Sequence, residues 1–213
     1  MNDFSAVLLA GGKSTRMGRD KATLPFGDGT LLTVQYEKLR ALGITDILVS
    51  GYGEGMIPDA EPGCGPLGGL AACLPRAQHP RVLVISVDVP LVSETTLRAL
   101  IAAHTGGVTI LRHGERTEPL IAVYDAALGE TAQQLLAQGK RAVRALLEST
   151  ECRVVDVEVP EWEFLNCNTP ETYAEALRST GGDGRFLNRP YGHERTANNA
   201  VGAHHDAPGG TRP

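Results

Sequence analysis

The sequence Val-Leu-Leu-Ala-Gly-Gly-Lys-Ser-Thr-Arg-Met-Gly-Arg-Asp-Lys occupies residues 7–21. It continues a short apolar run, Ala6 to Ala10, which has the length and composition of a buried strand. Gly11 and Gly12 follow, and their backbone can take positive φ because no side chain leaves Cα. Four cations come next: Lys13, Arg16, Arg19 and Lys21. Free backbone N–H groups followed by cationic side chains suit a polyphosphate, so the stretch predicts a nucleotide-binding loop.

The simpler interpretation of this stretch is a strand-to-helix turn whose basic residues only face water. Gly-Gly alone would favour that interpretation, but the regular order of strand, Gly-Gly, Arg, Gly and Asp-Lys favours phosphate binding. Two better-known phosphate loops are absent. Gly12 to Gly18 is followed by Arg19-Asp20, so the G-x-x-x-x-G-K-[ST] loop is excluded, and no G-x-G-x-x-G follows the strand.

Composition limits the class of protein. The chain has 213 residues, 42% of them hydrophobic, which suits one soluble domain with a sizeable core. A formal net charge of −5 argues against general nucleic-acid binding, so the basic loop is a local patch for a small anion. No apolar run is long enough for a membrane span. The N-terminal stretch has Asp3 and lacks the basic residues that begin a secretion signal, so we expect a cytoplasmic protein. No cysteine pair has metal-site spacing: Cys64, Cys73, Cys152 and Cys167.

Strands and helices alternate along the chain. Thr30 can cap a helix that runs to about Leu42, with Leu32, Tyr36 and Leu39 on its core face. Strands are predicted at 45–50 and 82–87, a helix at 66 onward, and another at 93–104 with Leu97, Leu100 and Ile101 inward. This order predicts an α/β fold with a mostly parallel sheet between two layers of helices, and a ligand site at the carboxyl ends of the strands.

The second half of the chain departs from that order. Strands at 108–112 and 120–124 are predicted to pair antiparallel, and two helices, 125–138 and 141–148, break at Gly139. A strand at 153–159 precedes a last helix that begins with the N-cap Thr169 and ends near Arg178. We expect His104 and His113 at the surface. The domain is predicted to span residues 1–178, and the sparsely apolar residues 179–213 to form a disordered tail.

Asp88 is the strongest candidate for a metal ligand. It follows the clearest buried strand, and Pro90 prevents that strand from continuing. One carboxylate together with substrate phosphates is a usual way to hold Mg²⁺. The alternative is that Asp88 caps the helix or turn that follows. The phosphate loop on the first strand favours the metal.

These motifs together resemble a known family. Leu9-Ala10-Gly11-Gly12-x-x-x-Arg16-Met17-Gly18-x-Asp20-Lys21 is similar to the signature of nucleotidyltransferases with a Rossmann-like, glycosyltransferase-A-like fold, and among them most resembles the molybdenum cofactor guanylyltransferases. Gly65-Pro66-Leu67, Asp88 and Asn166-x-Asn168-Thr169-Pro170-Glu171 match further motifs of that family. The resemblance extends over roughly residues 5 to 178.

The resemblance implies site residues and substrates. Leu9, Ala10, Gly11 and Gly12 would contact the nucleotide, as would Asp59 in the Gly- and Pro-rich loop 51–65. Lys21 would contact phosphate and Asp88 would bind Mg²⁺. To these we add Arg16 as a clamp on the β- and γ-phosphates. The implied substrates are GTP and molybdopterin cofactor, and the implied protein partners are other molybdenum cofactor proteins in transient contact.

Other functions stay open at this point. A cytidylyltransferase for the same cofactor usually has L-A-A-G with Phe after the Arg, whereas this chain has Gly11 and Met17. Ser50-Gly51-Tyr52 stands where some relatives carry an Asn that contacts the nucleoside. A sugar-1-phosphate nucleotidyltransferase is more distant. A non-catalytic nucleotide-binding regulatory domain would have little reason to keep Arg16, Lys21 and Asp88 together.

Overall fold

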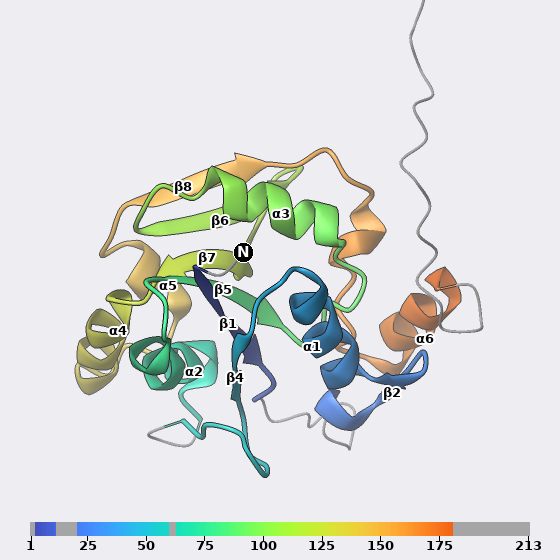
Figure 1. Ribbon diagram of the computed structural model, residues 1–213, viewed down its shortest axis with the longest axis horizontal. Coiled ribbons are helices and arrows are strands. Elements are labelled where there is room, and N and C mark those ends of the chain that lie inside the picture. The colour runs from blue at the N-terminus through green and yellow to red at the C-terminus, as the bar shows by residue number, and fades with distance from the viewer. Residues whose placement is uncertain (1–2, 12–20, 60–62, 181–213) are drawn as a thin grey trace, which may run out of the picture.

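The computed structural model describes residues 3–11, 21–59 and 63–180 (Figure 1). Its centre is a six-stranded sheet with the strand order β4-β1-β5-β7-β6-β8. Among these six strands only β7 runs against the others, because β4, β1 and β5 pair parallel, β6 pairs parallel with β8, and β7 is antiparallel to both β5 and β6. The strands are β1 (Phe4–Leu9), β4 (Asp46–Ser50), β5 (Arg81–Ser86), β6 (Val108–His113), β7 (Arg116–Asp125) and β8 (Cys152–Asp156). The predicted α/β fold with a mostly parallel sheet is therefore confirmed.

Helices cover both faces of the sheet, which explains why its central strands are so apolar. All six residues of β1 are buried, and alternate side chains belong to different cores. Phe4, Ala6 and Leu8 pack with helices α1 (Leu31–Ala41) and α3 (Glu94–Ala103). On the other face, Val7 and Leu9 pack with α2 (Gly65–Cys73), α4 (Leu128–Ala137) and α5 (Val143–Leu147), and Figure 1 shows the two groups on opposite sides.

A third, smaller core lies beside the sheet. The short antiparallel pair β2 (Pro25–Phe26) and β3 (Gly29–Thr30) precedes α1, and the last helix, α6 (Pro170–Ser179), packs against it. Phe26, Leu31, Cys167 and Ala176 share this cluster. Three 3-10 turns complete the described elements: Lys21–Thr23, Leu74–Arg76 and Glu161–Phe164. This cluster brings the segment around β2 and α1 into contact with α6, the last helix of the described domain.

Strand register aligns the carboxyl ends that matter for function. Leu9, the last residue of β1, lies opposite Ser50 of β4 on one side and Ser86 of β5 on the other. The segments that follow these three strands therefore leave the sheet at one edge, in the order β4, β1, β5. That edge is where parallel sheets bind ligands.

The predicted helices and strands are observed, but some of them begin or end at other residues than predicted. Thr30 caps α1, Ser93 caps α3 and Thr169 caps α6, as expected. The strand predicted at 120–124 begins earlier, at Arg116, because it pairs with all of β6 across a bulge between Ile110 and Leu111. The strand predicted to reach residue 159 ends at Asp156, where its pairing with β6 ends.

Three predictions of exposure were wrong. Tyr36 was placed on the core face of α1, but it is exposed, and the buried residues of that helix are Leu31, Gln35, Lys38 and Leu39. His104 is buried, with its two ring nitrogens 3.0 Å from Thr109 Oγ1 and 3.1 Å from Asp125 Oδ1. The side chain of His113 is 11% exposed and stacks on Phe164. The imidazole of His104 can be buried because Thr109 and Asp125 provide hydrogen-bond partners for both of its ring nitrogens.

Within the described residues, no helix combines the length and the low polarity that crossing a membrane requires. The predicted tail extends from residue 179, but α6 runs to Ser179 and Thr180 is buried. The rest of the tail, residues 181–213, lies outside the described part of the chain.

Candidate active site

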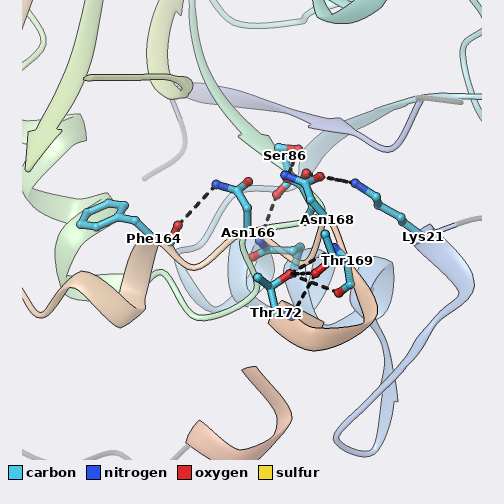
Figure 2. Close-up of polar contacts among 9 residues, drawn as sticks. Lys21, Ser86, Phe164, Asn166, Asn168, Thr169 and Thr172 are labelled. Atoms are coloured by element: carbon cyan, nitrogen blue, oxygen red, sulfur yellow. Dashed lines mark hydrogen bonds and ion pairs between the residues drawn. The ribbon is translucent and has the colours of Figure 1, made fainter. Parts of the chain in front are cut away.

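Lys21, Asp88 and Asn168 come from three separate motifs and meet at the carboxyl edge of the sheet. The Lys21 ammonium lies 3.5 Å from Asp88 Oδ2 and donates a hydrogen bond to Asn168 Oδ1, as Figure 2 shows for Lys21 and Asn168. The side chains of Lys21 and Asp88 are 19% and 17% exposed. A cation and a carboxylate that are held together and still reach solvent are available to a ligand.

The Asp88 carboxylate is oriented by its own strand. Ser86 ends β5, and its hydroxyl donates to Asp88 Oδ1 over 2.6 Å. The backbone carbonyl of Asp88 accepts a hydrogen bond from Cys167 N at 2.7 Å, which joins the strand end to the C-terminal motif. Ser93, and not Asp88, caps the next helix, α3. Asp88 is therefore not the cap of the following helix, which was one form of the alternative role.

The C-terminal motif is shaped by a helix cap. Thr169 accepts a hydrogen bond from Thr172 N, and the Thr172 hydroxyl accepts one from Thr169 N at the start of α6. Pro170 suits the first turn, where a helix needs no N–H donor. The cap fixes the preceding residue, Asn168, next to Lys21 (Figure 2). The predicted capping role and the predicted place of this motif beside the site are thus compatible.

Asp59 belongs to a second group of residues at the end of β4. The loop after β4 turns back, because Ile57 forms a parallel bridge with Ser50 and its N–H donates to Val49 O. The Ser50 hydroxyl then hydrogen-bonds the Asp59 carboxylate. Burial raises the pKa of Asp59, and the bond from Ser50 partly opposes that rise by stabilising the charged form.

Two glycines of α2 allow this second group to form. A Cβ added at Gly68 would lie 2.9 Å from Asp59 Cγ, and one added at Gly69 would lie 2.5 Å from Ser50 Oγ. Both distances are shorter than real Cβ contacts, so side chains at these positions would push Asp59 and Ser50 away. The Gly65-Pro66-Leu67-Gly68-Gly69 stretch is therefore a close-packing surface for the end of β4.

The end of β1 lies between the two groups. Ala10 N donates to Ser50 O at 2.8 Å, and Leu9 O accepts from Val87 N at 3.2 Å. Gly11 is exposed, beside Ser50 and Gly51. Since neighbouring strands are about 4.8 Å apart, the Asp88 side and the Asp59 side of this edge are separated by roughly 10 Å. Gly12 and Arg16, the remaining predicted site residues, lie outside the described residues.

The donor set at Asp88 fits a divalent cation that is also held by substrate phosphates. Within the described part of the chain, Ser86 contacts Oδ1 and Lys21 lies beside Oδ2, and each carboxylate oxygen keeps acceptor capacity for a ligand. Among the described residues, no group of three or more His, Cys, Asp or Glu side chains is arranged to hold a metal. A single protein carboxylate is how Mg²⁺ is commonly held when phosphates supply other oxygens.

The cysteines near the site are not reactive groups. Burial, with the Asp88 charge as a smaller contribution, raises the pKa of Cys167 to about 12. Burial likewise raises the pKa of Cys73 to about 12. Both stay protonated at neutral pH, so neither is a thiolate nucleophile or metal ligand.

Sequence reasoning missed Ser86. The signal was present, because Ser86 and Asp88 are two residues apart at a strand end and such residues face the same side. It was missed because a Ser inside an otherwise apolar run, Val82 to Val87, carries no motif of its own. Only the hydrogen bond to Asp88 reveals its place in the site.

Comparison with known proteins identifies the family. Residues 6–154 match the family model described as the MobA-like NTP transferase domain, and the chain belongs to this family. It is 37% identical to the molybdenum cofactor guanylyltransferase of Xanthomonas euvesicatoria pv. vesicatoria over 180 residues, which cover 82% of this chain and 94% of that protein. The family resemblance inferred from the motifs is thereby confirmed.

Solved structures support the fold. Molybdopterin-guanine dinucleotide biosynthesis protein A from Archaeoglobus fulgidus superimposes with a TM-score of 0.69 at 22% identity, covering 82% of this chain and 97% of that one. A Mycobacterium tuberculosis protein solved in complex with manganese superimposes with a TM-score of 0.61 at 19% identity, covering 84% of this chain and 100% of that one. At these identities the likeness concerns the fold alone.

Proposed function

We propose that this protein transfers GMP from GTP to the terminal phosphate of molybdopterin cofactor, giving the guanine dinucleotide form of the cofactor and pyrophosphate. The observation that carries the reaction type is the meeting of Lys21, Asp88 and Asn168 at the carboxyl edge of the sheet. The choice of substrates is supported by the 37% identity to a molybdenum cofactor guanylyltransferase over most of both chains.

The site residues divide between the two ends of a nucleoside triphosphate. Leu9, Ala10, Gly11 and Gly12, at the end of β1 and directly after it in sequence, contact the nucleotide. The Ala10 N–H already donates to Ser50 O, so it is not one of the donors to the phosphates. Lys21 neutralises phosphate charge on the Asp88 side, with Arg16 as a second cation for the β- and γ-phosphates. Asp59 contacts the nucleoside on the other side, about 10 Å away by strand spacing.

Asp88 is the residue that would hold Mg²⁺. When bound, the ion supplies charge neutralisation for the phosphates. The manganese in a protein of the same fold supports use of a divalent cation, and magnesium is the finer assignment of this proposal. The Ser86 hydroxyl holds the Asp88 carboxylate in one orientation through Oδ1.

The reaction is an in-line substitution at the α-phosphorus. A bond forms between a terminal phosphate oxygen of molybdopterin and the α-phosphorus, and the bond from the α-phosphorus to the bridging oxygen of the β-phosphate breaks. The electron pair leaves with pyrophosphate. The attacking phosphate oxygen is already ionised at neutral pH, so no general base is needed. The protein contributes positioning and neutralisation of charge by Lys21 and Arg16.

The test is to incubate the purified protein with Mg²⁺, molybdopterin and each of GTP, CTP, ATP and UTP, and to identify products by mass spectrometry. We expect the guanine dinucleotide product and pyrophosphate with GTP, and faster turnover with GTP than with CTP at equal concentration. A preference for CTP would reassign the protein as a cytidylyltransferase. Nucleotide binding without product from any acceptor would make it a non-catalytic regulatory domain.

A further inference from the structure

Two polar residues of α1 lie in the core behind the site. Gln35 is 0% exposed and Lys38 is 8% exposed, at positions where the helix packs on the sheet. Burying an amide and an ammonium in an apolar interior is unfavourable unless each finds hydrogen-bond partners. Both side chains donate hydrogen bonds to one short segment of backbone.

That segment is the turn that carries Asp88. Gln35 Nε2 donates to Ser86 O at 3.1 Å and to Val89 O at 2.8 Å. Lys38 Nζ donates to Pro90 O at 2.8 Å, and a hydrogen bond of 3.0 Å from Lys38 Nζ to Gln35 Oε1 holds the two side chains together. Three of these four bonds thus end on carbonyls within two residues of Asp88.

These carbonyls need donors because the sheet ends here. β5 stops at Ser86, and Val89 and Pro90 lie beyond the strand. Pro90 has no N–H of its own, so the segment cannot continue the ladder. Buried carbonyls without partners are costly, and the side chains of Gln35 and Lys38 supply them. The turn is therefore fixed by hydrogen bonds from two side chains of α1. In addition, Cys167 N in the C-terminal motif donates to the Asp88 carbonyl.

The surroundings of Lys38 partly offset the cost of burying its amino group. Glu163 and Glu94 act on it electrostatically. Glu163 is 1% exposed and accepts hydrogen bonds from Ser93 N and Thr96 Oγ1 at the start of α3. Its carboxylate is thereby fixed beside the segment that follows Pro90. Helix α1, the Asp88 turn and the start of α3 form one connected polar network.

We propose that Gln35 and Lys38 are positioning residues that fix the Asp88 carboxylate for binding of the divalent cation and the nucleotide phosphates. They do not touch substrate. They act by holding the carbonyls on both sides of Asp88, so that the carboxylate is presented in one orientation. The inference rests on the proposed nucleotidyl transfer, which supplies the role of Asp88.

The experiment compares Gln35→Met and Lys38→Met, which keep the approximate volume and remove the donors, with Leu135→Ala as a matched control. Leu135 is buried in the core on the opposite face of the sheet, so its truncation lowers stability without touching the Asp88 turn. The first readout is amide hydrogen exchange of the peptide that contains residues 86–90, measured on metal-free protein. The second is calorimetric titration with a non-hydrolysable GTP analogue over a range of magnesium concentrations.

We expect faster exchange at residues 86–90 in both donor variants and a magnesium midpoint raised about 10-fold, as for other residues that orient metal ligands. The control should lose thermal stability and keep both values. Unchanged exchange and a magnesium midpoint within about twofold of wild type would overturn the proposal. If a Met variant does not fold, Lys38→Gln and Gln35→Asn replace it. These variants keep N–H donors on shorter side chains, so we expect smaller changes in the same direction in hydrogen exchange and in the magnesium midpoint.

Failure of the proposed function is distinguishable from failure of this inference. If the wild-type protein makes no guanine dinucleotide product, the proposed function fails. Hydrogen exchange at residues 86–90 still reports whether Gln35 and Lys38 hold the turn, since it needs neither acceptor nor metal.

Discussion

The ion pair between Lys21 and Asp88 joins the start of the 3-10 turn Lys21–Thr23 to the segment that follows β5. Each member neutralises the other over 3.5 Å while both side chains remain partly exposed. In the proposed mechanism Lys21 binds phosphate in place of Asp88, and Asp88 binds the divalent cation in place of Lys21. A nucleotide bound with its cation therefore supplies a new partner for each member of the ion pair. The pair therefore predicts that each residue matters for turnover more than for folding.

Replacing Asp88 by Asn tests the metal assignment at the residue scale. Asn keeps size and shape but removes the charge that the cation needs, so we expect turnover at ordinary magnesium to fall strongly and to recover in part at high magnesium or with Mn²⁺. The measurement is initial rate against metal concentration. The control is Asp156→Asn, which removes an exposed carboxylate at the end of β8 that pairs with Arg112 of β6. Full activity with an unchanged magnesium dependence would remove Asp88 from the mechanism.

Replacing Lys21 by Ala tests the phosphate contact. A charge-assisted contact that strengthens in the transition state contributes about 2–4 kcal/mol, so the rate should fall roughly 30- to 1,000-fold while thermal unfolding changes little. Arg178→Ala removes an exposed cation at the end of α6 and should leave the rate unchanged. A Lys21→Ala protein with near-wild-type kcat/KM would show that Lys21 does not contact the reacting phosphates.

At the scale of elements, helix starts position the site. α6 begins with a capping box formed by Thr169 and Thr172, and α1 begins with an equivalent box formed by Thr30 and Thr33. The two caps are chemically matched, but only the α6 cap directly follows Asn168, the partner of Lys21. A pair of identical substitutions can therefore separate stability from site geometry.

We predict that Thr30→Ala and Thr169→Ala each cost about 1 kcal/mol of unfolding free energy, or about 2–4 °C in Tm for a domain of this size. Thr169→Ala should in addition lower kcat, because Asn168 loses the cap that fixes its backbone. Thermal unfolding and steady-state kinetics on both variants give the comparison. Equal kinetic effects of the two substitutions would mean that the α6 cap has no special role in the site.

The stability of the whole molecule should depend on pH through Lys38. Burial lowers the pKa of Lys38 from 10.5 to about 7, and the charges of Glu163 and Glu94 oppose that change. Between those two pKa values the unfolded chain binds one more proton than the folded protein, so stability rises with pH. At low pH, folding must bury a protonated lysine, which lowers the free energy of unfolding. As the pH rises above 7 the buried lysine becomes neutral, and this cost disappears.

Urea unfolding of wild type and Lys38→Met at pH 7, 8 and 9 measures this dependence. We expect wild type to gain stability relative to the variant by at most about 1.4 kcal/mol per pH unit over this range. The exposed Lys140, replaced in the same way, should give no pH-dependent difference from wild type. Parallel curves for wild type and Lys38→Met would show that Lys38 keeps the same protonation state in the folded and unfolded protein.

The boundary of the domain is also a property of the whole molecule. The last described helix ends at Ser179 and Thr180 is buried, so we propose that the folded unit ends there and that the low apolar content of residues 181–213 keeps them out of the core. A chain truncated after Thr180 should unfold within about 2 °C of the full-length protein and keep its activity. A large drop in Tm would show that the tail packs on the domain.

The sequence alone predicted the class of fold correctly, and the candidate site residues could be proposed from it one by one. Local signals were sufficient for this, because buried strands are continuous apolar runs, helix caps are short polar motifs, and a carboxylate at a strand end has a definite place in a parallel sheet. Lys21, Asp88 and Thr169 could each be proposed from their immediate neighbours. The antiparallel excursion at β6 and β7 was predicted in the same way.

The contacts among these residues depend on the tertiary structure and could not be predicted from the sequence. The contact of Lys21 with Asp88 and Asn168 depends on strand order and on the packing of α6, which join segments up to 147 residues apart. Ser86 and Asp88 are neighbours, yet the role of Ser86 follows from one hydrogen bond. Gln35 and Lys38 lie on the buried face of α1, where the sequence pattern predicted apolar residues. Their cost of burial is offset by hydrogen bonds to carbonyls in the segment that follows β5. Periodicity cannot anticipate such compensation, since the partners are specified by how the chain packs in space.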